Sequence, residues 1–462
     1  MEWIDAATAA ERLGVKPATL YAYVSRGVLK RRHGEDGRRS LFDADEIEQL
    51  ARRGRPRNQP PELVIESAVT ALGADRPYYR GYDALALATT ASFEEVAEWL
   101  WTGAPPTGLR QRPGSGGSSP HPGAGFGGGG PGLAADFGGG GPGLAAGSRG
   151  GGSRPAAGSG GSGSRPVGGD GGSGAGVPWR CEKKALRAAV AAQRGLPPGL
   201  LPLDRLQVIT TVLGASDSLR YQLDPASVAA TGRRLVAGLV DALPEEGEPQ
   251  GESIAERLWA RLTPHPATPG LLDALRAALV LLADHELAAS TLAARVAASA
   301  KADPYAVVLT GLGVLGGPLH GGAAYGAERL LAEVSEPGLA ARVVADRVRR
   351  GERIPGFGHS VYKNGDARGS LLLDLVREAS PEHERLAAVV AVLDEVRRRR
   401  LPERNVDFAL AALVAVGGMV PGAGEAIFAV ARTVGWLAHA MEEYAKGTLL
   451  RLRASYTGPP PR

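Results

Sequence analysis

Cysteine, long apolar runs and metal-binding spacings are what this sequence most clearly lacks. A single cysteine, Cys181, is present among 462 residues, so a disulfide framework within the chain is excluded and a reducing compartment is favoured. No apolar run reaches the roughly eighteen residues that a membrane span needs, and no basic and apolar leader opens the chain. Histidine, cysteine and acidic residues nowhere follow the spacing of a metal site. We therefore expect a cytoplasmic protein with no membrane partner and no metal.

Glycine is abundant but unevenly placed. Residues 105–177 consist mainly of Gly, Pro, Ser and Ala, and the sequence FGGGGPGLAA occurs there twice, at Phe126–Ala135 and at Phe137–Ala146. Such a segment buries too little apolar surface to offset its ordering entropy, so we predict a disordered insertion. A neutral expansion is favoured over a tract that binds a partner. The length of the chain predicts more than one folded unit around it.

The first block of the chain, residues 1–52, is predicted to form two helices, a hairpin and a third helix. The amphipathic stretch at 6–13 ends at a glycine, and the second helix begins at 16–17, where proline costs least. A turn with two glycines lies within 31–40, and the acidic run at 43–46 signals the third helix. The string AAERLGVKPATLYAYVSRGVLKRR resembles the winged helix-turn-helix of the MerR and excisionase type.

This resemblance implies a possible DNA partner for residues 1–52. Basic residues are clustered in this part of the chain, although the formal net charge of the whole chain is only +4. The residues assigned to DNA contact are Thr19, Tyr21, Arg26, Arg38 and Arg39. A domain retained for protein contacts is the alternative reading. Residues 53–61, rich in Arg and Pro, are predicted to be a linker.

The remaining chain is predicted to be almost entirely helical. Apolar residues recur at spacings of three and four, and strand-like alternation is scarce. The stretches with this period are 206–213, 228–243, 271–282, 292–300, 324–334 and 386–396. Gly311, Gly313 and Gly316 match the G-x-G-x-x-G pattern, but that fingerprint needs a preceding strand and this region predicts a helix. We therefore reject a dinucleotide site and assign an all-α fold.

Three stretches place residues capable of proton chemistry among glycines, where backbone can approach a ligand closely. They are GLGVLGGPLHGGAAYG at 311–326, RIPGFGHSVYKNGDARG at 353–369 and NVDFAL at 405–410. Together with LLADHELAAST around His285 and FAVARTVGWLAHAMEE around Arg432, they resemble the citrate synthase family. The stretch YYRGYDALALATTASFEEVAEWLWTG is similar to the N-terminal region of the same family.

The resemblance implies a citrate synthase fold with a large and a small helical domain. The N-terminal part of that fold would occupy 62–104 and the catalytic part 178–462, with a small domain at about 322–417 that closes over the substrate. The expected activity joins acetyl-CoA to oxaloacetate and then hydrolyses the thioester, in a homodimer that needs no cofactor. Alternatives are a 2-methylcitrate synthase that uses propionyl-CoA, citryl-CoA cleavage, and a DNA-binding regulator that senses CoA thioesters or oxo acids.

The chemistry of this reaction explains the residue types. Removing a proton from a thioester methyl group needs a carboxylate base and a donor for the developing enolate oxygen. Asp407 resembles the catalytic base of the family, and His320 resembles the histidine that stabilises the enol. A helix is predicted directly after His320, and a helix N-terminus disfavours imidazolium. His359 resembles the catalytic histidine that polarises the oxo acid carbonyl.

Binding residues follow from the same resemblance. Arginine forks suit carboxylates, and Arg368 and Arg432 match arginines that hold the oxo acid, as does His285. Arg451 matches an arginine lent by the partner subunit. Lys363 matches a residue that pairs with a CoA phosphate. The loop expected to cradle the adenine of CoA comprises Ile354, Pro355, Gly356, Phe357 and Gly358.

The sequence departs from the family pattern at several positions. Ala324 stands where an asparagine is usual, and Ala367 and Leu452 replace prolines. We expect the first change to alter a hydrogen bond near His320, and the other two to relax the loops that orient Arg368 and Arg451. Residues 408–410, Phe-Ala-Leu, lack the usual tyrosine and serine, which leaves the preferred acyl group open.

Overall fold

The structure is a computed structural model of the chain. It describes residues 3–13, 15, 17–25, 29–33, 40–44, 46–47, 64–106, 179–363, 365–452, 454 and 456–458. The predicted linker at 53–61 lies outside these residues, and so does nearly all of the predicted disordered insertion. Within the described ranges, no helix is long and apolar enough to cross a membrane.

The N-terminal unit contains the two predicted helices and a small sheet. Its elements are β1 (Trp3–Asp5), α1 (Ala6–Leu13), α2 (Pro17–Ser25), β2 (Arg31–His33) and β3 (Ser40–Asp43). The sheet is antiparallel with the order β1-β3-β2, so the predicted hairpin is confirmed as the β2–β3 pair. Leu20, Phe42 and Ile47 are fully buried and form the centre of a separate small core. The predicted third helix falls largely outside the described residues.

A second small sheet was not predicted from the sequence. It consists of β4 (Thr70–Leu72), β5 (Pro77–Tyr79) and β6 (Tyr82–Asp83), in the order β4-β5-β6. The strands are two or three residues long, too short for alternation to be visible in the sequence. Tyr79 of β5 is buried, and its hydroxyl donates to the carbonyl oxygen of Val280 over 2.9 Å and lies within 3.2 Å of those of Leu281 and Asp284. Tyr79 therefore connects this sheet to the C-terminal end of a helix in the core.

Helices make up the rest of the structure, as predicted. They are α4 (Ala84–Thr90), α5 (Phe93–Thr102), α6 (Lys183–Ala192), α7 (Pro202–Ser216), α8 (Pro225–Asp241), α9 (Ile254–Leu262), α10 (Pro269–Leu282), α11 (Ala289–Ser299), α12 (Pro304–Leu315), α13 (Gly322–Glu333), a 3-10 turn at Pro337–Leu339, α14 (Ala340–Arg349), α15 (Ala367–Ala379), α16 (Glu384–Arg398), α17 (Val406–Val416) and α18 (Ala423–Lys446). Proline opens α7, α8, α10 and α12, where its missing N–H has no helical partner to lose. The helix α12 contains Gly311 and Gly313 and is capped by Gly316, which confirms that a helix and not a strand leads into this glycine pattern.

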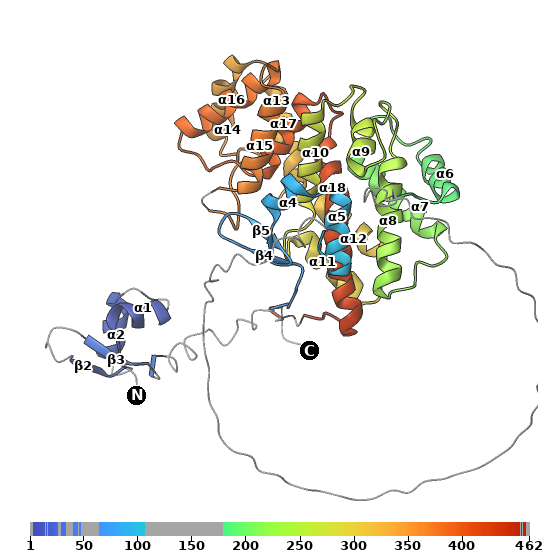
Figure 1. Cartoon of the computed structure of the whole chain (residues 1–462). Helices are drawn as coiled ribbons and strands as arrows, with labels where there is room; N and C mark the ends of the chain where they lie inside the picture. Colours follow the sequence, from blue (N-terminus) through green and yellow to red (C-terminus); the bar gives the residue numbers. More distant parts are fainter. Residues whose placement is uncertain are drawn as a thin grey trace, which may run out of the picture.

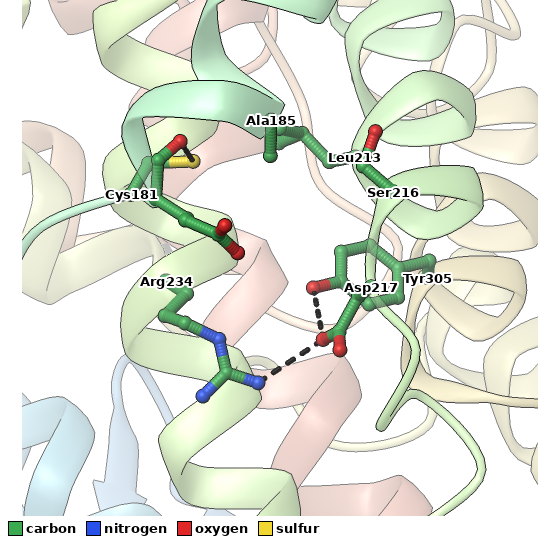
Figure 2. A pocket seen from close by; sticks show the side chains of 8 residues that line it. Cys181, Ala185, Leu213, Ser216, Asp217, Arg234 and Tyr305 are labelled. Carbon is green, nitrogen blue, oxygen red and sulfur yellow. Dashed lines mark hydrogen bonds and ion pairs between the residues drawn. The ribbon is translucent and has the colours of Figure 1, made fainter.

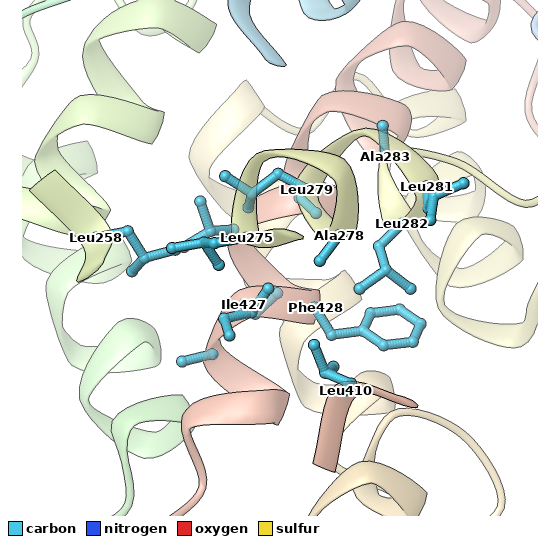
Figure 3. Packing of buried hydrophobic residues seen from close by; sticks show 14 of the residues in the cluster. Leu258, Leu275, Ala278, Leu279, Leu281, Leu282, Ala283, Leu410, Ile427 and Phe428 are labelled. Carbon is cyan, nitrogen blue, oxygen red and sulfur yellow. The ribbon is translucent and has the colours of Figure 1, made fainter. Parts of the chain in front are cut away.

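Helix α18 lies at the centre of the helical body (Figure 1) and is buried along most of its length. Leu275, Leu279 and Leu282 of α10 face Ile427 and Phe428 of α18 in the core (Figure 3). The helices α13–α17 gather on one side (Figure 1) and fall within the range predicted for a small domain. The division into two domains itself stays a prediction.

The single cysteine lies two residues before α6. Cys181 is partly buried beside Ala185 and Leu213, and the nearby Tyr305 hydroxyl donates to the Asp217 carboxylate over 2.8 Å (Figure 2). Burial raises the pKa of the Cys181 thiol to about 11. Because the thiolate is the nucleophilic form, this cysteine is poorly suited to covalent catalysis at neutral pH.

Candidate active site

Two histidines and a tyrosine from different parts of the chain meet in one cluster. His285 follows α10, whereas His359 and Tyr362 lie in the loop before α15. The His285 Nε2 atom is 3.0 Å from the Tyr362 hydroxyl oxygen, and the His285 and His359 rings meet edge to face at 5.4 Å. The His359 ring stacks on Tyr362 at 4.6 Å. Burial, followed by the charges of Arg368 and Arg432, lowers the pKa of His285 well below its usual value.

The backbone of its own loop fixes the tautomer of His359. Its Nδ1 atom accepts hydrogen bonds from the N–H groups of Val361, at 3.0 Å, and Tyr362, at 3.1 Å. The neutral ring therefore carries its proton on Nε2. Burial, and then the charge of Arg368, lowers the pKa of His359 to about 4, so the ring is neutral near pH 7. The Arg368 Nη2 atom lies 3.5 Å from Nε2. Because both atoms are donors, an oxygen acceptor fits beside them.

A buried carboxylate holds Arg368 in place. Asp366 caps α15 and receives two parallel hydrogen bonds from the Arg368 guanidinium, at 2.9 and 2.8 Å. Its second oxygen also accepts from the N–H of Val406 in α17, over 3.1 Å. The Arg368 side chain is 3% exposed. A bidentate ion pair thus orients the guanidinium of Arg368.

Arg432 is buried with part of its guanidinium unused. It is 1% exposed, and its Nε atom donates to the carbonyl oxygen of Leu282 over 2.8 Å. Its Nη1 atom is buried and has no hydrogen-bond partner. Burial lowers the pKa of Arg432 to about 10, which keeps the group charged near pH 7. A buried cation with a free donor is suited to an anionic ligand.

Asp407 lies in the first turn of α17. The N-cap residue Asn405 accepts from the N–H groups of Asp407 and Phe408 through its side-chain oxygen, over 3.0 and 3.4 Å. The Oδ1 atom of Asp407 is buried without a hydrogen-bond partner. Burial raises the pKa of Asp407 to about 7, although Arg368 and Arg432 oppose this shift. A carboxyl group poised near neutral pH is suited to general base catalysis.

The loop at 354–358 is fastened to the same helix start. The Asn405 amide donates to the Gly358 carbonyl over 2.9 Å, and the Asn405 N–H donates to the Gly356 carbonyl over 3.0 Å. Gly356 has a φ of +82°, and a Cβ there would lie 2.7 Å from the Cβ of Phe408. The Phe357 ring contacts the Phe408 ring at 4.7 Å. The loop predicted to bind adenine and the helix start that carries Asp407 are therefore held together by direct contacts.

His320 lies two residues before α13, close to the predicted helix start. Its Nε2 atom is 2.6 Å from the Ser290 hydroxyl oxygen, and that oxygen also accepts from the Trp436 indole N–H over 3.2 Å. Burial, and then the charge of Arg432, lowers the pKa of His320 to about 4. The ring is therefore neutral near pH 7. Ala324, at the position of the usual asparagine, is fully buried.

Other predicted residues lie at the edge of this cluster or beyond it. Lys363 is exposed and lines an open cavity of about 440 Å³ together with His359, Tyr362 and residues 400–404. Arg451 is exposed in the segment after α18. Thr19 and Tyr21 are exposed on α2. The other three predicted DNA contacts, Arg26, Arg38 and Arg39, lie outside the described residues.

Four residues of the site were not predicted from the sequence: Ser290, Tyr362, Asp366 and Asn405. Asn405 carried a usable signal, because asparagine directly before a helical run is a favoured N-cap. The roles of Ser290, Tyr362 and Asp366 depend on contacts between distant segments, which the sequence does not reveal. Across the described ranges, no group of three or more His, Cys, Asp or Glu side chains could hold a metal ion.

The family model described as "Citrate synthase, C-terminal domain" matches residues 179–453, and a "Helix-turn-helix domain" model matches residues 3–55. "Citrate synthase 2" of Bacillus subtilis is 35% identical over 271 residues, which cover 56% of this chain and 73% of that protein. "2-methylcitrate synthase 2" of Corynebacterium glutamicum is 27% identical over 281 residues, covering 57% and 73%.

Solved structures show the same fold. Citrate synthase of Thermoplasma acidophilum, in a ternary complex with carboxymethyl coenzyme A and oxaloacetate, aligns with a TM-score of 0.61 and 22% identity. The alignment covers 87% of this chain and 96% of that one. The family model spans more than half of the chain. The protein therefore belongs to the citrate synthase family and carries a helix-turn-helix domain at its N-terminus.

Proposed function

We propose that the protein condenses acetyl-CoA with oxaloacetate and hydrolyses the resulting thioester to citrate and CoA. The observation that carries this proposal is the buried, unpartnered carboxyl oxygen of Asp407, in a group whose pKa is about 7. A base of this kind can take a proton from a thioester methyl group near neutral pH. The citrate synthases among the relatives support the choice of reaction.

The neutral His320 complements this base. As Asp407 removes the proton, negative charge develops on the thioester oxygen, and a neutral imidazole N–H can stabilise it by donating a hydrogen bond. A pKa of about 4 keeps the His320 ring neutral over the pH range in which Asp407 is ionised. The Ser290 hydroxyl, 2.6 Å from Nε2, supports the ring orientation. Proton removal and charge stabilisation thus fall to separate groups.

The second substrate needs a polarised carbonyl and cations for its carboxylates. The Nε2–H of His359 is the donor proposed for the carbonyl of the oxo acid, because Nδ1 is already occupied by two backbone donors. Arg368 and Arg432 would hold the carboxylates, and His285 would contact the same substrate. The free Nη1 donor of Arg432 supports this assignment. The enol carbon of the acyl-CoA would then attack the carbonyl carbon of the oxo acid and form the new carbon–carbon bond.

The acyl-CoA would bind along the loop at 354–358, with Lys363 beside a CoA phosphate. Closure of the helices at about 322–417 would exclude water until the carbon bond has formed. The mechanism calls on no metal and no cofactor. Arg451 would reach the oxo acid of the partner subunit in a homodimer. A cytoplasmic location completes the proposal, supported by the single free cysteine.

The choice between an acetyl and a propionyl group needs a separate test, because the chain resembles both a citrate synthase and a 2-methylcitrate synthase. One methylene changes discrimination by about ten- to two-hundredfold in an apolar pocket. Steady-state CoA release should therefore be compared for acetyl-CoA and propionyl-CoA with oxaloacetate. We expect the larger kcat/KM with acetyl-CoA. A tenfold preference for propionyl-CoA would instead assign the reaction to 2-methylcitrate formation.

The helix-turn-helix domain supports a second candidate function, a regulator that binds DNA. Thr19 and Tyr21 are exposed on α2, the helix that would face DNA. The full chain and a variant lacking residues 1–57 should be compared for retention of genomic DNA fragments at several salt concentrations. Phosphate contacts predict binding that weakens steeply with salt and is lost in the truncated variant. Equal retention by both proteins would contradict the proposal.

A further inference from the structure

The turn that carries His285 is held by a buried carboxylate to which no role has yet been assigned. Asp284 is fully buried, and its Oδ2 atom accepts from the N–H of Glu286 over 3.2 Å. Glu286 adopts a φ of +51°, a left-handed conformation that is costly for a residue with a side chain. The Asp284 carboxylate therefore stabilises the strained turn whose central residue is His285.

His439 of α18 is a second hydrogen-bond partner of the Asp284 carboxylate. The guanidinium of Arg295 can only donate, so the 2.6 Å contact from its Nη1 makes Nδ1 of His439 an acceptor. The neutral His439 ring then carries its proton on Nε2, which donates to Asp284 Oδ2 over 3.2 Å. Arg295 is itself held by Glu442 and Glu443, so its charge is balanced. The proton on His439 thus points in one defined direction, toward Asp284.

The same face of α18 also carries the substrate-binding candidate Arg432. Gly435 is packed so closely that a Cβ there would lie 2.3 Å from Asp284 Oδ1, and its N–H donates to the Ala283 carbonyl over 3.0 Å. Arg432, one turn earlier, donates to Leu282. Residues 282–284 therefore each contact α18, through Arg432, Gly435 and His439. Burial opposes ionisation of Asp284, but the interaction with His439, followed by the charge of Arg432, holds its pKa below the usual value.

We propose that Asp284, oriented by His439, is a positioning residue for the oxo acid site. It fixes the turn that aims His285 at Tyr362, and its negative charge lies near Arg432 and offsets that buried cation. This inference rests on the proposed function, since His285 and Arg432 are the groups assigned to the oxo acid. Asp284 acts through them and contacts no substrate. Loss of the Asp284 carboxylate therefore weakens the binding of oxaloacetate but not the binding of the acyl-CoA.

Asp284→Asn removes the charge while keeping the size of the side chain. We expect the KM for oxaloacetate to rise about tenfold or more, because small misplacements of binding groups are costly. The KM for acetyl-CoA should stay within about twofold, a split that general loss of structure would not produce. Thr210→Val is the matched control. It removes another fully buried polar group, whose hydroxyl donates to Leu206 within α7, and it should change neither KM.

A pair of His439 variants gives a second test in case Asp284→Asn does not fold. Glutamine can place an amide N–H near the position of Nε2, so His439→Gln should keep the wild-type KM for oxaloacetate within about threefold. His439→Leu has no donor and should raise it as Asp284→Asn does. Equal oxaloacetate KM values for the wild type and His439→Leu would overturn the inference, whether or not Asp284→Asn folds.

Oxaloacetate binding measured without turnover separates this inference from the proposed function. The shift in melting temperature caused by oxaloacetate should be recorded for the wild type and Asp284→Asn. A wild type that binds oxaloacetate but releases no CoA defeats the proposed function. The positioning role then stands if Asp284→Asn weakens binding and falls if it does not. A wild type that neither binds nor turns over overturns both.

Discussion

At the scale of single residues, the carboxyl group of Asp407 sets the expected pH dependence. Its pKa of about 7 means that the active, ionised form is lost as the pH falls through neutrality. His320 and His359, with pKa values of about 4, stay neutral throughout this range. The kcat/KM for acetyl-CoA should therefore fall about tenfold per pH unit below pH 7. A profile that is flat from pH 5.5 to pH 8 would contradict this role.

The raised pKa of Asp407 also predicts a cost in stability. The folded state binds the proton more tightly than the unfolded state, so this group lowers the free energy of unfolding as the pH rises from about 4 through about 7. At pH 8 the free energy of unfolding of Asp407→Asn should therefore be about 1–3 kcal/mol higher than that of the wild type. This difference should disappear near pH 4. Urea denaturation at both pH values measures the difference. A variant that is less stable at pH 8 would refute this prediction.

Arg432 offers a test of how the oxo acid is held. Lysine keeps the charge but cannot both bond the Leu282 carbonyl and present a second donor in the fixed geometry of a guanidinium. Arg432→Lys should raise the KM for oxaloacetate about ten- to a hundredfold and leave the KM for acetyl-CoA nearly unchanged. Steady-state kinetics with each substrate varied in turn measures both. An equal rise in the two KM values would speak against a specific contact.

At the scale of elements, the loop at 354–358 and helix α17 are predicted to work as a unit. Gly356→Ala would place a methyl group against Phe408 and should lower both kcat and the melting temperature. Gly351→Ala is the control, since Gly351 has a similar φ of +71° but open space around it. It should cost about 1 kcal/mol of stability and leave kcat unchanged. Similar kcat values for the two variants would argue against the coupling.

Helix positions were largely predictable because apolar spacing and end signals agree along this chain. The predicted helix at 6–13 matches α1, and the helix expected after His320 begins at Gly322. The motif residues His285, His359, Arg368, Arg432 and Asp407 interact in one electrostatic cluster, as the resemblance implies. Their roles in catalysis remain predictions that the experiments above address.

The supporting contacts were not predictable, since they join segments far apart in the sequence. Asp366 bonds Val406 forty residues away, and Tyr79 bonds the end of α10 across about two hundred. The sequence suggested that Ala367, in place of proline, would loosen Arg368. The buried ion pair between Arg368 and Asp366 was not foreseen, because a spacing of two residues alone does not reveal it, and the effect of Ala367 on the loop stays a prediction.

At the scale of the whole molecule, Arg451 should complete the site of a second subunit. Asp407→Asn and Arg451→Ala should each be inactive alone. After mixing and exchange of subunits, half of the dimers would contain one of each, and one of their two sites would be intact. Activity should return to about one quarter of the wild-type value. No recovery, despite mixed dimers seen by native mass spectrometry, would place Arg451 in the site of its own subunit, and an active Arg451→Ala variant would place it outside any site.

The central claim, that this chain condenses an acyl-CoA with an oxo acid through Asp407, has a direct test. CoA release should be measured with acetyl-CoA and oxaloacetate for the wild type and Asp407→Asn, with oxaloacetate binding recorded for both. We predict release that requires both substrates and falls about a thousandfold in the variant, with binding retained. No release by the wild type, or an undiminished rate in Asp407→Asn, would contradict the claim.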